Sequence, residues 1–175
     1  MADDTASTGR AGGASGSGSG SRHAVTARTK ARRRAVEILF EADQRGLLRS
    51  GDGEAGSGAS NPAGAAERLR ELAAERAVHS ANHTEAPAYT REILSGVADH
   101  LAEVDEIIET YSQGWTLARM PAVDRAIARV ATWEIVWNDD VDVPVAVDEA
   151  MTLGRMLSTD DSPRFLNGLL GRIGD

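Results

Sequence analysis

Apolar side chains recur along this chain at intervals of three and four residues, the spacing of one face of an α-helix. The clearest run repeats at 3-4-3-4-3 spacing and predicts one long core helix from about Pro87: Leu94, Val97, Leu101, Val104, Ile108 and Tyr111. An earlier helix, starting near residue 29, has an apolar face made of Ala31, Ala35, Ile38, Leu39 and Ala42. Charged side chains occupy its opposite face.

Four more helices are predicted from the rest of the pattern. A short one covers about 65–79, and Pro121 suits the first turn of a long one that stops in "NDDVD". Pro144 opens the next, and Ser162 followed by Pro163 predicts an N-cap and first position of the last. Only "DVDVPVAV" resembles a strand, and Pro144 favours a helix start there. The predicted class is all-α, with six or seven helices.

Two segments interrupt this pattern because they have almost no large apolar side chains. Residues 1–25 include "GRAGGASGSGSGS" and cannot offset their ordering entropy by burial, so we expect a disordered tail. Residues 46–66 begin with Gly46, a plausible helix stop, and we expect a flexible insertion. The remaining residues, 26–175, are predicted to form a single domain.

Composition narrows the possibilities further. A chain of 175 residues with 41% hydrophobic residues is long enough for one packed domain. It has no cysteine, which excludes a disulfide framework or a thiolate metal site. No apolar signal core and no stretch of about 20 apolar residues is present, so we expect a cytoplasmic protein without a membrane segment. We expect no cofactor.

Positive charge is concentrated at the start of the first helix. From Arg22 to Arg34 there are six Lys/Arg and no Asp/Glu, whereas the rest of the chain has 13 basic and 27 acidic residues. Cations at a helix N-terminus oppose the macrodipole, so helix stability does not explain the cluster. A solvated helix start is one interpretation. Phosphate binding is the other interpretation, and the sequence slightly favours it. The side chains expected to contact phosphate are Lys30, Arg32, Arg33 and Arg34.

The start of the last helix is the second candidate site. Free N–H groups at a helix N-terminus attract anions, and Arg164 lies in the first turn beside Phe165. Phe165 is either a core residue or a platform on which a base stacks. His79 and His83 lack a carboxylate or cysteine that would complete a metal site. No nucleophile and base are suitably spaced, so we expect no enzyme activity.

Four segments carry a resemblance to a known family: "ARRRAVEILFEAD", "YTREILSGVADHLAEVDEIIETY", "MPAVDRAIARVATWEIVW" and "VPVAVDEAMTLGRMLSTDDSPRFLNGLLGRI". Their succession resembles the transcription antitermination factor NusB family over about residues 27–173. The resemblance implies two packed helical subdomains, about 27–112 and 114–173. It also implies binding of single-stranded boxA RNA from ribosomal RNA leaders together with the ribosomal protein NusE, followed by assembly with other Nus factors on RNA polymerase.

The resemblance also assigns roles to particular residues. It implies RNA contacts by Lys30, Arg32, Arg33, Arg34, Tyr111, Asp161, Ser162, Arg164 and Phe165, and a NusE surface around Asp124 and Arg129. Some members of the family form homodimers and others are monomers, so a homodimer is possible. The competing hypothesis is a protein-only scaffold whose arginines dock an acidic partner. Such a scaffold would show no preference for boxA over an unrelated strand.

Overall fold

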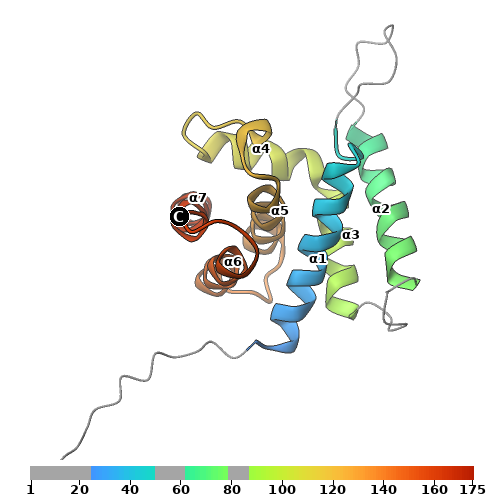
Figure 1. Cartoon of the computed structure of the whole chain (residues 1–175), viewed down its shortest axis with the longest axis horizontal. Helices are drawn as coiled ribbons and strands as arrows, with labels where there is room; N and C mark the ends of the chain where they lie inside the picture. Colours follow the sequence, from blue (N-terminus) through green and yellow to red (C-terminus); the bar gives the residue numbers. More distant parts are fainter. Residues whose placement is uncertain (1–24, 50–61, 79–86) are drawn as a thin grey trace, which may run out of the picture.

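The computed structural model describes residues 25–49, 62–78 and 87–175 (Figure 1). Within these ranges the chain forms seven α-helices and one short 3-10 helix, and no strand, which confirms the all-α prediction. The elements are α1 (Ala27–Gln44), α2 (Pro62–Val78), α3 (Ala88–Asp99), α4 (Leu101–Tyr111), η1 (Leu117–Arg119), α5 (Ala122–Trp137), α6 (Val143–Leu157) and α7 (Ser162–Gly174).

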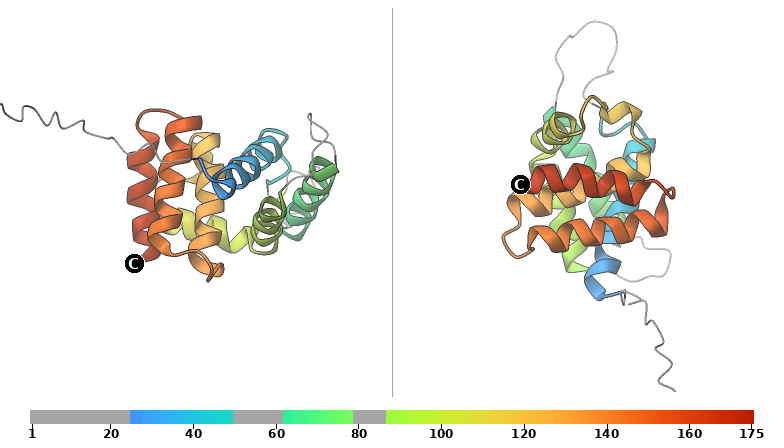
Figure 2. Two further views of the ribbon diagram at one scale, coloured as in Figure 1. Left: turned by 90° about the horizontal axis from the view of Figure 1, so that it is seen from below. Right: turned by 90° about the vertical axis from the view of Figure 1, so that its left-hand side faces the viewer.

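The helices pack around α1 and α5. In Figure 1, α2 and α3 lie on one side of α1, while α5, α6 and α7 lie on the other. Figure 2 shows α6 and α7 side by side at the side of the molecule that is remote from α2. Buried apolar side chains from all seven helices form one core, which includes Leu39, Leu69, Ile93, Ile108, Ile127, Leu153 and Leu169.

Helices α1 and α5 run antiparallel and are joined by ion pairs at both ends of their contact. Near the start of α1, Arg32 Nε lies 2.7 Å from Glu134 Oε1, close to the end of α5. Near the end of α1, Asp43 Oδ2 lies 2.8 Å from Arg125 Nε in the first turn of α5. At a rise of 1.5 Å per residue, these pairs are roughly 15 Å apart on both helices.

Several helix boundaries differ from the predictions. The single long helix from Pro87 is two helices, because His100 has φ −119° and ψ 22° between α3 and α4. Helix α2 begins at Pro62, so residues 62–66 of the expected insertion are helical, and Leu48 is buried in the core. Residues 1–24, 50–61 and 79–86, which include most of the expected tail, the rest of the insertion and both His79 and His83, lie outside the described residues. The division into two subdomains stays a prediction.

The predicted stop at Gly46 has a clear structural basis. Gly46 has φ 70°, a left-handed conformation that glycine adopts without steric cost. Its N–H donates to Asp43 O, and Leu47 N–H donates to Ala42 O, and both N···O distances are 2.9 Å. This is the Schellman arrangement that closes a helix C-terminus. It directs the chain away from the end of α1 and fixes the length of that helix.

Candidate nucleic-acid interface

The first two turns of α1 present cations to solvent. Thr26 caps the helix by accepting a hydrogen bond from Thr29 N at 3.1 Å, and the first turn contains no acidic residue. Lys30 is exposed and forms no ion pair within the described ranges. Arg33 and Arg34 lie further along the same exposed side. Lys30 therefore adds its charge to the positive end of the helix dipole, and Arg33 and the partly exposed Arg34 extend the positive surface by one turn.

Arg33 and Arg34 share a single surface carboxylate. Arg33 Nε lies 3.1 Å from Glu37 Oε1, and Arg34 Nη1 lies 3.5 Å from Glu37 Oε2. The side chains of Arg33 and Glu37 are 48% and 42% exposed. Ion pairs this exposed contribute at most about 1 kcal/mol, so a phosphate can compete with Glu37 for both guanidinium groups.

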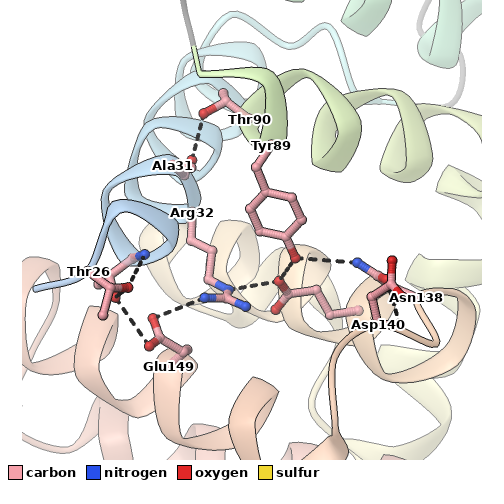
Figure 3. A network of polar contacts seen from close by, with 10 residues as sticks. Thr26, Ala31, Arg32, Tyr89, Thr90, Asn138, Asp140 and Glu149 are labelled. Carbon is pink, nitrogen blue, oxygen red and sulfur yellow. Dashed lines mark hydrogen bonds and ion pairs between the residues drawn. The ribbon is translucent and has the colours of Figure 1, made fainter.

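Arg32 differs from its neighbours because its side chain points into the protein (Figure 3). It is 3% exposed, and it pairs with Glu134 of α5 and with Glu149 of α6, whose Oε2 lies 3.4 Å from Arg32 Nη1. The expectation that Arg32 contacts RNA therefore conflicts with its position. A guanidinium buried between two carboxylates cannot reach a phosphate in solvent without breaking both pairs.

Tyr89 of α3 completes the buried cluster. Its hydroxyl donates to Glu134 Oε1 and accepts from Asn138 Nδ2 at 3.4 Å. Its ring lies beneath the guanidinium of Arg28, 4.5 Å from Arg28 Cζ, and 5.4 Å from Arg32 Cζ. These are cation–π distances. One tyrosine thus contacts both the buried acid and two arginines of α1.

The pKa directions in this cluster follow from burial and charge together. Burial raises the pKa of Tyr89, and so does the hydrogen bond to Glu134. Burial lowers the pKa of Arg32, but the charge of Glu134, its hydrogen bond and the charges of Tyr89 and Glu149 together outweigh burial, so the pKa is raised. Burial raises the pKa of Glu134, and the like charge of Glu149 raises it further. The charge of Arg32 and the hydrogen bonds from Tyr89 and Arg32 lower this pKa but only partly offset burial. The guanidinium stays charged and is the counterion for two acids.

The start of α7 contains exposed and buried candidates side by side. Asp161 and Arg164 are exposed, and Arg164 forms no ion pair with any described residue. Ser162 is 1% exposed and donates to Asp124 Oδ2 at 3.0 Å, so the expectation that it contacts RNA conflicts with its buried position. It also accepts from Thr159 N at 3.2 Å. Ser162 is the first helical residue rather than the N-cap, which is Asp161.

An apolar hollow lies beside this helix start. Its volume is about 300 Å³, and it is lined by Trp115, Met120, Pro121, Asp124, Thr159, Asp161, Ser162 and Phe165. Phe165 is half-buried, packing against the core while one side lines the hollow. Trp115, at 55%, is the most exposed of the large apolar side chains described. Two aromatic rings therefore border one accessible hollow.

The sequence argument missed two exposed aromatic residues. Trp115 lies in the connection after α4, outside any periodic run. Phe40, 37% exposed, lies on α1 outside its buried apolar face. Its signal was its position seven residues after Arg33, because this spacing brings two side chains to one face of a helix. Tyr111, which the sequence did single out, is 40% exposed, and its carbonyl accepts from Arg172 Nε at 2.9 Å.

The two residues expected at the NusE surface are both buried. Both Asp124 carboxylate oxygens accept serine hydroxyls, from Ser158 at 2.6 Å and from Ser162 at 3.0 Å. Arg129 is 4% exposed and pairs with Asp105 through Nε at 2.8 Å. These side chains hold α5 to its neighbours, so direct contact with a partner conflicts with their positions. The family resemblance placed a NusE surface around these residues, and a resemblance does not show which way a side chain points.

Other regions of the described chain offer less to an anion. A hollow between α2 and α4 is walled by Asp105, Glu106 and Glu109, which would repel phosphate. Among the described residues, no group of three or more His, Asp or Glu is placed to hold a metal ion. No helix in these ranges is long and apolar enough to cross a membrane.

The fold and the site together define an all-helical protein with a cationic helix start and exposed aromatic side chains, a combination suited to nucleic acid. The sequence profile of the NusB family matches residues 29–175, and the chain belongs to this family. A relative from Beutenbergia cavernae, named transcription antitermination protein NusB, is 52% identical over 151 residues, covering 85% of this chain and 90% of the relative. One of the same name from Arthrobacter sp. is 48% identical over 149 residues, covering 85% and 93%.

Solved structures agree with the fold. NusB from T. maritima matches with a TM-score of 0.61 and 27% identity, covering 85% of this chain and 91% of that one. A crystal structure of the antitermination factors NusB and NusE in complex with dsRNA matches with a TM-score of 0.59, covering 84% of this chain and 95% of that one. Its identity is 21%, so this second match shows the fold alone.

Proposed function

We propose that this protein is a transcription antitermination factor that binds boxA RNA of ribosomal RNA leader transcripts jointly with NusE. In this proposal the pair joins an elongating RNA polymerase with other Nus factors and suppresses premature termination. The observation that carries the proposal is the exposed basic side of α1, where Lys30, Arg33 and Arg34 lie at the positive end of a helix. Family membership and the NusB–NusE–RNA complex of a structural relative support it.

The proposed RNA surface has two parts. Phosphates would contact Lys30, Arg33 and Arg34 on α1, since cations neutralise backbone charge without reading sequence. Unpaired bases would stack on the exposed rings of Tyr111 and Trp115, at and after the end of α4, and on the half-buried ring of Phe165 at the start of α7. The exposed side chains of Asp161 and Arg164 lie beside them at the α7 start. Stacking on aromatic rings favours a single strand, because paired bases are not available.

The two parts lie at opposite ends of α5. Glu134, near its end, pairs with Arg32 in the basic stretch of α1, while Asp124, in its first turn, hydrogen-bonds Ser162 of α7. Ten residues of helix separate them, which is about 15 Å along the axis. One extended strand can therefore span both parts.

The test is a titration with boxA RNA and with a scrambled strand of equal length, each with and without NusE. We expect preference for boxA and tighter binding with NusE present. Replacing Lys30, Arg33 and Arg34 with glutamine should reduce the slope of log affinity against log salt by roughly 2, at about 0.7 per phosphate contact. Equal affinity for both strands would instead favour a protein-only scaffold that docks an acidic partner.

A further inference from the structure

We propose that Arg32 is a positioning residue. From inside the protein it fixes the start of α1, so that Lys30, Arg33 and Arg34 face RNA phosphates together, and it does not contact RNA itself. The inference rests on the proposed RNA-binding function. It separates residues that look equivalent in the sequence, because Arg32 and Arg33 are adjacent and identical in type, yet one is 3% exposed and the other lies on the surface.

Arg32 links α1 to two other helices at once. Its Nε contacts Glu134 of α5 at 2.7 Å, and its Nη1 lies 3.4 Å from Glu149 of α6. Thr29, one turn earlier, donates to Glu149 Oε1 at 3.2 Å. Figure 3 shows the Arg32 side chain reaching from α1 toward Glu149 of α6. Arg33 and Arg34 therefore lie on a helix start that interior contacts with α5 and α6 anchor.

Helix α3 holds the same segment from another direction. Thr90 Oγ1 donates to Ala31 O at 2.9 Å, and Tyr89 donates to Glu134, the acid that Arg32 also contacts. Thr90 is fully buried. Tyr89 therefore shares its acceptor with Arg32, and loss of the arginine would remove a link between α1 and both α3 and α5.

The charge balance makes this arrangement depend on Arg32. Two buried acids, Glu134 and Glu149, face one buried cation, and Glu149 Oε2 has no hydrogen-bond partner among the described residues. Without the guanidinium, two like charges would remain in a site closed to water. Breaking a buried pair on one side costs far more than replacing both partners with neutral groups. The resulting loss of stability would be concentrated in the first turns of α1, because both acids contact that segment.

Order at this helix start affects RNA affinity directly. Contacts to phosphate contribute fully only when the cations are already held on one face, because ordering them on binding opposes association. In Arg32→Met we expect affinity for boxA RNA to fall about tenfold or more, since ordering each flexible side chain on binding costs roughly two- to tenfold. The slope of log affinity against log salt should stay that of the wild type, because no phosphate contact is removed.

Arg33→Met is the matched control, because it removes the same charge one residue away at an exposed position. We expect its salt slope to fall by about 0.7 with unchanged thermal stability. Arg32→Lys keeps the charge but cannot reproduce the forked contact with two acids. It should lose affinity with an unchanged slope, whereas a phosphate contact would be largely preserved by lysine.

The double variant Arg32→Met with Glu134→Gln decides between the two roles. It removes both charges of the closest pair, and glutamine still accepts from Tyr89, while Glu149 keeps Thr29. We expect boxA affinity to rise at least about threefold above that of Arg32→Met, since the double variant removes the repulsion between two buried acids and leaves only Glu149 without a cation. A slope reduced by about 0.7 in Arg32→Met, or a double variant as weak as the single one, would overturn the proposal.

Hydrogen exchange of the α1 amides supplies a readout that needs no RNA. Arg32→Met should lose protection in the first turns of α1, and the double variant should regain it, while Arg33→Met should keep it. Unchanged protection in Arg32→Met would also refute the positioning role. If the wild type shows no preference for boxA but the exchange pattern holds, the proposed function fails and the anchoring of α1 by Arg32 stands.

Discussion

Gly96 of α3 lies directly against the indole of Trp133 in α5, and this contact gives a sharp test of the packing. A Cβ on Gly96 would overlap the Nε1 and Cε2 atoms of that ring. Trp133 is only 6% exposed and belongs to the central core. A rigid ring enclosed by core side chains cannot yield without displacing its neighbours. Gly96→Ala should therefore destabilise the protein, although alanine is the better helix former.

The expected size follows from two opposing effects. Alanine in place of glycine inside a helix adds about 1 kcal/mol. Overpacking a core costs about 1–3 kcal/mol, and overlap with ring atoms places Gly96 at the upper end of that range. The net loss in free energy of unfolding is therefore about 2 kcal/mol. At roughly 2–4 °C per kcal/mol for a chain of this size, the melting temperature should fall by about 4–8 °C.

Thermal and urea unfolding followed by far-ultraviolet circular dichroism measure this loss. The matched control is Gly171→Ala in α7, where a Cβ would meet nothing within 4 Å. There the helix preference acts alone, so stability should rise by about 0.5–1 kcal/mol. The same substitution should thus have opposite signs at two helical positions. If Gly96→Ala were as stable as the wild type while Gly171→Ala behaved as expected, α3 would not pack on Trp133 as described.

Three further predictions address the surface and the helix contacts. Phe165→Ala should weaken boxA binding by about 1–3 kcal/mol in an RNA titration. In urea unfolding of the same sample, its loss of unfolding free energy should be smaller than the roughly 3–5 kcal/mol that a fully buried phenylalanine would lose. Glu37→Gln releases both exposed arginines of α1, so RNA affinity should rise, most at low salt, and a fall would contradict competition by Glu37. The hydrogen bond from Arg76 lowers the pKa of Glu41 below 4.5, so its stabilisation is present above pH 4.5 and is lost as pH falls through the folded-state pKa. The stability gap between wild type and Arg76→Gln should therefore shrink at acid pH in denaturant melts, and a constant gap would refute the pairing.

Apolar periodicity predicted the helices well, because each helix buries one stripe and the stripe has a fixed spacing. It failed to find the break at His100, since the 3-4 spacing continues across it from Val97 to Leu101. The break coincides with a contact from a distant element: the His100 ring stacks on Trp137, with centroids 4.3 Å apart. A contact between residues so far apart along the chain leaves no mark on the local pattern.

The candidate site was predicted less completely, because sequence gives the charge of a side chain but not its direction. For Arg32 the direction could have been inferred. Residues three, four and seven positions later are Ala35, Val36 and Leu39, all buried, so Arg32 belongs to the inner face of α1. The same signal existed for Asp124, because the residues at these spacings, Ile127, Ala128 and Ala131, are all buried. Only its serine partners, more than thirty residues away along the chain, could not be inferred from the local pattern.

The ion pairs between α1 and α5 are better explained by register than by helix stability. Asp43 lies in the last turn of α1 and Arg125 in the first turn of α5, and each charge opposes the dipole of its own helix. Their pairing across the interface offsets that cost. An interface of small apolar side chains would tolerate a slide of one turn, about 5.4 Å, whereas such a slide would break this pair and the Arg32–Glu134 pair together. The register of α1 also decides which arginines point outward. The same interior contacts that align the two helices therefore determine which cations remain available to RNA.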